Sequence, residues 1–299
     1  MPHVIGIDAG GTKTVGLLAD ETGKVLAKAI SGSANLVMKG ELAVEKVIFD
    51  VIESLEAPEP VAALCLGIAG VGQVGADQLI RDVLRRLGHR QPIRVVNDAL
   101  VALVAGAPSG VGIVVVAGTG SIAYGVDPNG HTARSGGWGY LLGDEGSAFW
   151  LGHYAVRHAI RAADGRGIAT TLYDLICDKL GVSDPTELVE WFYDQELSRN
   201  RVADLASLVE TASADGDEAA ENLLDQGAKH LASAARAVAG QLSFPDPYPI
   251  VLSGGAFKAC PSLHRRIETL LEDLPGSEVR LLEVEPAQGA VTLALELLK

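Results

Sequence analysis

The stretch that decides the fold is Asp8 to Thr14 (DAGGTKT), together with the two apolar segments that flank it. The segment Val4 to Ile7 predicts a short buried strand before this stretch, and Val15 to Ala19 predicts a second strand after it. The turn residues Asp20 to Gly23 then lead into a third strand at Val25 to Ala27. The pattern therefore predicts a three-stranded meander whose first turn is rich in glycine, threonine and lysine.

The same plan recurs roughly 110 residues later, which is too long a period for a solenoid repeat. Val111 to Val116 predicts an apolar strand, Ala117 to Ser121 (AGTGS) a turn of small residues, and Ile122 to Val126 the returning strand. Asp127 to Gly130 (DPNG) is a second turn, in the place that DETG takes in the first copy. The repeat predicts two domains of one topology that face each other.

Strands and helices alternate along the rest of the chain, which predicts the α/β class. Apolar periodicity indicates helices at residues 41–57 and 78–87, with strands at 62–68, 93–96 and 249–253. The sequence from Asp144 to the last of these strands is mostly helical. We expect a first domain at residues 1–108, a larger second domain at 109–286, and a C-terminal helix at 287–299.

The composition excludes several classes of protein. The chain has 299 residues, with 24 basic and 38 acidic side chains and a net charge of −14, so bulk charge gives no basic face for nucleic acid or an anionic membrane. No apolar run approaches the roughly 18 residues of a membrane span, and the N-terminus lacks a signal-peptide pattern. The three cysteines, Cys65, Cys177 and Cys260, form neither a disulfide framework nor a zinc motif. A soluble cytoplasmic protein is the expectation.

Glycine is over-represented, with 35 residues against a usual share of about 7%, and its clusters fall where predicted strands end. A turn of small residues exposes successive backbone N–H groups to a phosphate. Asp8, just before the first turn, could hold Mg²⁺ through water. One such turn alone also fits an ordinary hairpin, but three in this order favour a nucleotide. The predicted ATP-binding residues are Gly10, Gly11, Thr12, Lys13, Thr119, Gly120, Gly254 and Gly255.

Asp98 is the candidate catalytic base. It follows the predicted strand at residues 93–96, so it should lie where a parallel strand ends at a cleft. Asn97 or Asp98 also fits the cap of the next helix, and the two roles are compatible. Asp144 opens the helical region after a glycine, where a cap is again the plain alternative to a binding role.

The order of these motifs resembles the ASKHA phosphotransferases. DAGGTKT, Asn97-Asp98, AGTGS, GGWG (136–139), LLGDEGSAFWLG (141–152) and LSGGAFK (252–258) are similar to the N-acetylglucosamine kinase and archaeal broad-specificity hexokinase branch of the BadF/BadG/BcrA/BcrD ATPase-type family. The resemblance covers essentially the whole chain. It implies two ribonuclease-H-like domains of the actin and hexokinase type around a central cleft that binds ATP, Mg²⁺ and a sugar, with the terminal helix packed on the first domain.

The resemblance also implies roles for individual residues. Asp98 matches the aspartate that accepts the proton of the sugar hydroxyl, and Asp144 matches a carboxylate that binds sugar hydroxyls. Trp138 would form a wall against the sugar, with a buried core tryptophan as the plain alternative. Ser121 matches a position near the C2 substituent of the sugar. The full set of predicted sugar-binding residues is Asn35, Asn97, Ser121, Gly136, Gly137, Trp138 and Asp144.

One departure from the pattern bears on the substrate. Animal N-acetylglucosamine kinases usually carry Asn after the residue that Ser121 matches, whereas this chain has Ile122, as archaeal hexokinases have an apolar residue there. We therefore expect a kinase that phosphorylates the 6-hydroxyl of a hexose or hexosamine, such as N-acetylglucosamine, glucosamine or glucose. The alternatives are an activating ATPase coupled to electron transfer, and a nucleotide-switched binding protein like actin or the chaperone ATPases. A homodimer is expected only by analogy with this branch.

Overall fold

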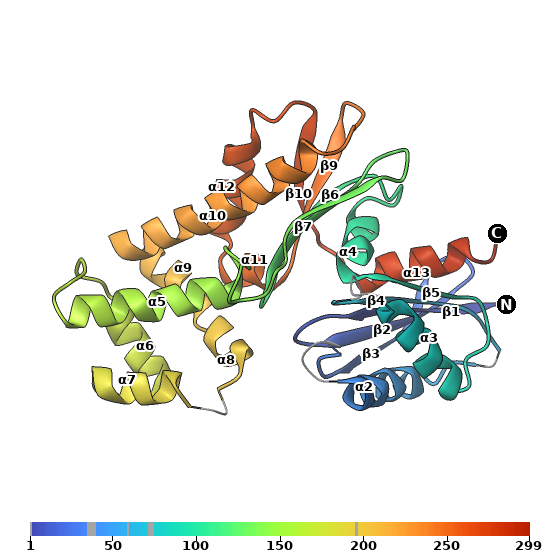
Figure 1. The fold of residues 1–299 in the computed structure, drawn as a ribbon, viewed down its shortest axis with the longest axis horizontal. Coiled ribbons are helices and arrows are strands. Elements are labelled where there is room, and N and C mark those ends of the chain that lie inside the picture. The colour runs from blue at the N-terminus through green and yellow to red at the C-terminus, as the bar shows by residue number, and fades with distance from the viewer. Residues whose placement is uncertain (1, 35–39, 59, 71–74, 195–196) are drawn as a thin grey trace.

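The fold is built on two five-stranded sheets (Figure 1). The computed structural model describes residues 2–34, 40–58, 60–70, 75–194 and 197–299. In the first sheet the strand order is β3-β2-β1-β4-β5; β1, β2 and β3 form an antiparallel meander, and β4 and β5 add in parallel beside β1. The strands are β1 (His3–Ala9), β2 (Thr14–Asp20), β3 (Val25–Ser31), β4 (Val61–Ile68) and β5 (Ile93–Asn97).

The second sheet repeats this topology. Its order is β10-β9-β6-β7-β8, with an antiparallel meander of β6, β7 and β8 and two strands parallel to β6 on its other side. The predicted two copies of one α/β topology are therefore confirmed. The strands are β6 (Gly112–Ala117), β7 (Ser121–Val126), β8 (Thr132–Gly136), β9 (Tyr248–Ser253) and β10 (Ser277–Leu281).

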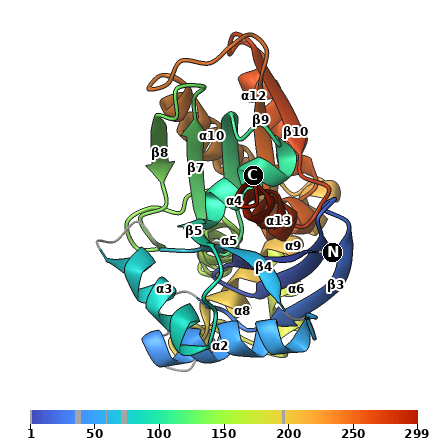
Figure 2. The same ribbon diagram turned by 90° about the vertical axis from the view of Figure 1, so that its right-hand side faces the viewer.

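Helices cover both faces of the first sheet. Successive side chains of a strand point to opposite faces, so the apolar side chains of β1 need to be covered on both. Ile5 and Ile7 of β1 pack with α2 (Glu41–Ser54) and α3 (Ala76–Arg86) on one face. Val4 lies on the other face, in a cluster with α4 (Asp98–Gly106) and the C-terminal helix α13 (Ala287–Glu296). Figure 2 shows α13 close to end-on, between the two sheets.

Helix α4 also joins the two sheets. Ala99 and Leu103 on one side of α4 pack against Val114 of β6 and Val251 of β9, while Val101 and Val104 pack with α13. The helix is almost wholly apolar, which fits a helix that is enclosed on both sides. Its first residue, Asp98, is consequently held in place by both halves of the molecule.

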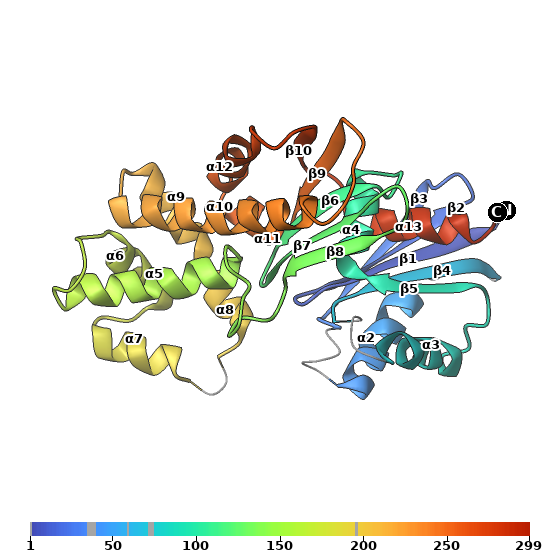
Figure 3. The same cartoon turned by 45° about the horizontal axis from the view of Figure 1, so that its top comes forward.

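A group of helices extends the second sheet away from the first (Figures 1 and 3). Together they enclose the larger hydrophobic core, to which Ile113 and Leu252 of the sheet contribute. None of the helices in the described ranges has both the length and the apolar character needed to cross a bilayer. The remaining helices are α5 (Ala148–Ala163), α6 (Leu172–Leu180), α7 (Pro185–Phe192), α8 (Arg199–Ala203), α9 (Ala206–Ala214), α10 (Glu218–Ala239), α11 (Gly255–Ala259) and α12 (Ser262–Leu271).

Candidate functional site

Asp98 lies at the carboxyl end of β5, as the first residue of α4. The N–H of Ala99 donates to Asn97 Oδ1 at 2.8 Å and to Asp98 Oδ1 at 3.0 Å. Asn97 is the cap of the helix, so Asp98 keeps oxygen lone pairs for another proton donor. Burial raises the pKa of Asp98 to about 6, against the hydrogen bonds that it accepts from backbone N–H groups. A carboxyl with such a pKa is ionised at neutral pH and is a stronger base than a solvated one.

Asp8 is the second carboxylate at this edge of the sheet. The register places Asp8 beside Gly67 of β4, and Gly67 beside Val96 of β5. Gly67 lets α4 lie close to the sheet, since a Cβ there would be 1.8 Å from a methyl carbon of Val101. Burial, followed by the negative charge of Asp98, raises the pKa of Asp8 to about 8. The negative charges of these two carboxylates repel each other in a buried setting. A divalent cation bound at this edge of the sheet would relieve that repulsion.

We expect Asp8→Asn to stabilise the protein when no nucleotide or divalent cation is present. The wild-type carboxyl holds its proton up to a pH of about 8 in the folded state, whereas the unfolded chain loses it near pH 4. Ionisation therefore costs stability progressively between these pH values, and asparagine avoids that cost. The melting temperature should rise by roughly 3–8 °C at pH 8.5, and by much less at pH 5. An equal shift at both pH values would contradict this origin.

The threonine turns of the two sheets meet. Thr12, between β1 and β2, lies with its Oγ1 2.7 Å from Oγ1 of Thr119, between β6 and β7. The Gly10 N–H donates to the carbonyl of Lys13 at 3.1 Å, which closes the first turn. The Lys13 ammonium lies 3.7 Å from Glu285, a residue that also pairs with Lys28 at 2.7 Å. Two of the three predicted nucleotide turns are thus in direct contact.

The third turn lies beside the second. Gly254 follows β9 with a φ of +122°, and a Cβ there would be 2.2 Å from the carbonyl oxygen of Ala117 in β6. Gly255 opens α11, as predicted, and no atom lies within 4 Å of the place where its Cβ would be. The open space at Gly255, in contrast to the close contact at Gly254, is available to a ligand.

Asp144 lies beside the second turn and not in a helix. It adopts a left-handed φ of +59°, and α5 begins only at Ala148, with Ser147 as its cap. The expectation that Asp144 opens a helix is therefore wrong; glycines on both sides of the Asp-Glu pair allow a tight turn instead. Burial raises the pKa of the Asp144 carboxyl, and backbone N–H groups of Ser121 and Gly139 oppose this by donating to it. A Cβ at Gly120 would lie 2.7 Å from Asp144 Oδ2, so Asp144 adjoins the predicted phosphate turn.

The other predicted sugar-binding residues differ in whether they are already bonded within the protein, packed against a neighbour or exposed. The Ser121 hydroxyl donates to the carbonyl of Glu145 at 2.8 Å. Gly136 and Gly137 both have a positive φ, and Ile122 fills the space where a Gly137 side chain would lie. Trp138 is 62% exposed and carries the guanidinium of Arg134 at 3.9 Å from its ring, so the alternative of a buried core tryptophan is wrong. Asn35 lies outside the described residues.

Sequence reasoning did not identify α8. Asn200 Oδ1 accepts a hydrogen bond from Thr119 Oγ1 at 3.0 Å and lies 3.4 Å from Thr12 Oγ1. Arg199 beside it lies 5.3 Å from the centre of the Tyr140 ring. This segment follows the second turn by about 80 residues and carries no motif, so only the three-dimensional contact reveals it.

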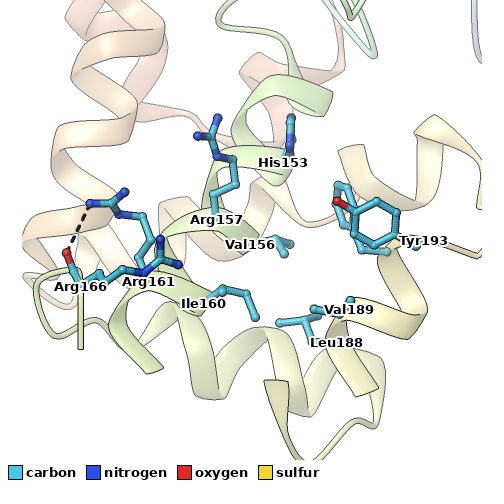
Figure 4. A pocket seen from close by; sticks show the side chains of 10 residues that line it. His153, Val156, Arg157, Ile160, Arg161, Arg166, Leu188, Val189 and Tyr193 are labelled. Atoms are coloured by element: carbon cyan, nitrogen blue, oxygen red, sulfur yellow. Dashed lines mark hydrogen bonds between the residues drawn. The ribbon is translucent and has the colours of Figure 1, made fainter. Parts of the chain in front are cut away.

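A hollow of about 340 Å³ lies elsewhere, between α5 and α7 (Figure 4). Val156 and Ile160 of α5 and Leu188 of α7 line its apolar part, and Arg166 lies at its edge. Arg166 is already paired with Asp164. Among the described residues, none of the predicted site residues lines this hollow. They gather instead where the two threonine turns meet, and that region is the candidate site.

Comparisons with known proteins agree with this architecture. The model of the BadF/BadG/BcrA/BcrD ATPase family matches residues 5–294. The chain belongs to this family. It is 33% identical to the N-acetylmuramic acid/N-acetylglucosamine kinase of Clostridium acetobutylicum over 98% of both chains, and 31% identical to the N-acetyl-D-glucosamine kinase of Dictyostelium discoideum over 97% of both.

A solved structure from Chromobacterium violaceum, provisionally described as an N-acetylglucosamine kinase, shares the fold. It superposes with a TM-score of 0.76 at 29% identity, over 100% of this chain and 99% of that one. The two sheets of identical topology are those of the two-domain actin-like ATPase and hexokinase fold. The family and the fold predicted by the sequence motifs are both confirmed.

Proposed function

We propose that this chain is an ATP-dependent kinase that phosphorylates the 6-hydroxyl of a hexose or hexosamine. The observation that carries the proposal is the position of Asp98, which follows β5 at the same edge of the first sheet as Asp8 and close enough for its charge to raise the pKa of Asp8. The threonine turns that would bind the phosphates come from both sheets and meet through Thr12 and Thr119. The two relatives described above are named as kinases of N-acetylated amino sugars.

In this proposal the three turns hold ATP. The backbone N–H groups around Gly11 and Thr119 bind phosphate oxygens. The open space beside Gly255, at the turn that Gly254 allows, is left for the nucleoside or a phosphate. Asp8 would hold Mg²⁺ through water, and its carboxylate suits this role because a cation would offset the negative charge that burial and Asp98 make unfavourable. When bound, Mg²⁺ neutralises charge on the phosphates. The Lys13 ammonium then leaves Glu285 and pairs with a phosphate of the nucleotide.

Asp98 accepts the hydrogen bond of the attacking sugar hydroxyl and finally its proton. Because phosphoryl transfer has a loose transition state, orienting the oxygen matters more than removing its proton early. Asp144 accepts hydrogen bonds from other sugar hydroxyls. Ile122, packed beside Gly137, gives the proposed position near the C2 substituent an apolar side chain instead of an amide. The proposal therefore includes hexoses as well as N-acetylated sugars.

A coupled kinase assay tests the proposal directly. The purified chain is supplied with ATP, Mg²⁺ and, in turn, glucose, glucosamine, N-acetylglucosamine and N-acetylmuramic acid. We expect ADP formation that depends on at least one of these sugars. No turnover with any of them would overturn the sugar-kinase proposal, and hydrolysis that is independent of sugar would favour the nucleotide-switched alternative.

The activating-ATPase alternative receives no support from the cysteines. All three are buried, and burial raises the pKa of Cys65 and of Cys260 to about 12. That alternative needs cysteines at a subunit interface to hold an iron–sulfur cluster, whereas these three side chains are enclosed within the protein. The cytoplasmic location and the homodimer stay predictions.

We expect Gly118→Ala to weaken ATP binding without loss of stability. No atom lies within 4 Å of the place where a Cβ of residue 118 would be, and Gly118 does not adopt a left-handed φ. If phosphate occupies that space, a methyl group there should raise the KM for ATP about tenfold or more, a cost within the 1–3 kcal/mol of overpacking. Steady-state kinetics and a melting curve check both parts. An unchanged KM for ATP would show that phosphate does not occupy the space beside Gly118.

A further inference from the structure

Helix α8 brings a polar side chain to the junction of the two threonine turns. Asn200 Oδ1 lies 3.0 Å from Thr119 Oγ1 and 3.4 Å from Thr12 Oγ1, and the two hydroxyl oxygens are 2.7 Å apart. Each hydroxyl has a single proton to donate. The arrangement with the shortest distances has Thr12 donating to Thr119 and Thr119 donating to Asn200. Both protons are then used within the protein.

The helix is fixed firmly enough for this contact to be specific. Val202 and Ala203 of α8 are buried in the larger hydrophobic core, where they pack with α5 and its neighbouring helices. Gly152 of α5 lets the two backbones approach, since a Cβ at Gly152 would lie 2.0 Å from the carbonyl oxygen of Val202. Figures 1 and 3 both show α8 on the side of the helical group that is nearest to the first sheet.

Arg199, the residue before Asn200, lies toward Asp144, the proposed sugar-binding carboxylate. Arg199 is half-buried, lies over Tyr140, and makes no ion pair with any residue in the described ranges. Burial raises the pKa of Asp144, and the positive charge of Arg199 acts in the opposite direction. Two consecutive residues of α8 therefore face the two halves of the candidate site.

We propose that α8 forms a third wall of the active site and that Asn200 binds a phosphate oxygen of the nucleotide there. Phosphate oxygens only accept hydrogen bonds, so on binding the two threonine hydroxyls turn toward them. The Asn200 amide can turn as well and donate to phosphate, because it carries two N–H donors besides the carbonyl that accepts from Thr119 in the free protein. The inference rests on the proposed function for the identity of the nucleotide.

Asn200→Asp separates this role from a structural one. Aspartate keeps the oxygen that accepts from Thr119, but it has no N–H donor and adds a negative charge. If Asn200 faces phosphate, binding of a non-hydrolysable ATP analogue should weaken by about 10–100-fold, and more than in Asn200→Ala, because a hydrogen bond to a charged group is worth about 1.5–3 kcal/mol. The KM for the sugar should stay within about twofold.

The experiment compares Asn200→Asp, Asn200→Ala and the control Asn129→Asp, which alters an exposed turn between β7 and β8. Calorimetric titration with the analogue gives the affinity, and melting curves confirm that each variant is folded. Wild-type affinity in Asn200→Asp would overturn the inference, because a purely structural acceptor tolerates that change. The titration needs no sugar turnover, so it distinguishes failure of this inference from failure of the sugar-kinase proposal.

Gly152→Ala tests the wall without touching Asn200. The added methyl group must push α8 away from α5, so affinity for the analogue should fall several-fold. Gly227→Ala in α10 is the matched control, because its Cβ would meet other atoms only at 3.4 Å or more. Equal affinity in Gly152→Ala and Gly227→Ala, with both folded, would show that the position of α8 does not matter for the nucleotide.

Discussion

Asp98→Asn is expected to lower kcat by about 10²–10⁴-fold, the usual contribution of a general base. Asparagine keeps the size of the side chain and the oxygen that accepts from the Ala99 N–H at 3.0 Å, so the helix start should survive. What it loses is the ability to take the proton of the sugar hydroxyl. Binding of sugar and of ATP should persist, because neither depends on that proton.

The measurement is steady-state kinetics together with separate titrations of sugar and of ATP analogue. Asp178→Asn, an exposed residue of α6, is the control for a change of one charge. For the wild type, kcat should also fall as the pH drops through about 6, where the Asp98 carboxyl becomes protonated. A kcat in Asp98→Asn equal to that of the wild type would remove Asp98 from the role of base.

Most of the fold could be predicted from the sequence because its decisive features are local. The two glycine and threonine turns each sit between an apolar strand and its antiparallel return, so Asp8 and Thr119 could be placed at strand ends without a structure. Asp98 follows the same logic, at the end of a short strand with a capping residue before it. These positions follow from the order of residues and need no long-range contact.

The parts that could not be predicted depend on contacts between distant segments. Asn200 belongs to a helix of the second half, and its role emerges only because Gly152 lets α8 lie against α5. Asp144 has the composition of a helix start, yet its left-handed φ places the helix start at Ala148 instead. Trp138 fits a core residue by type alone, and only the fold shows that it is exposed. Residue type and spacing do not encode such pairings.

Gly289→Ala is expected to have the largest effect on stability. Gly289 lies in α13 where this helix crosses α4, and a Cβ there would be 1.9 Å from the carbonyl oxygen of Val101 and 2.7 Å from the N of Ala105. Both neighbours are backbone atoms, so relief requires a shift of a whole helix. Alanine favours a helix by about 1 kcal/mol over glycine, but overpacking of this kind costs more. We expect a net loss of about 2–4 kcal/mol.

This substitution also tests how the catalytic edge is held. Because α4 begins at Asp98, a displacement of α4 should lower kcat more than it changes the KM for ATP, whose proposed turns lie outside α4. Gly227→Ala, in a helix with room for the methyl group, should keep its stability and its kcat. If Gly289→Ala melts at the same temperature as Gly227→Ala, the close crossing of α13 and α4 is not what secures Asp98, and its position must depend on the contacts of α4 with the second sheet instead.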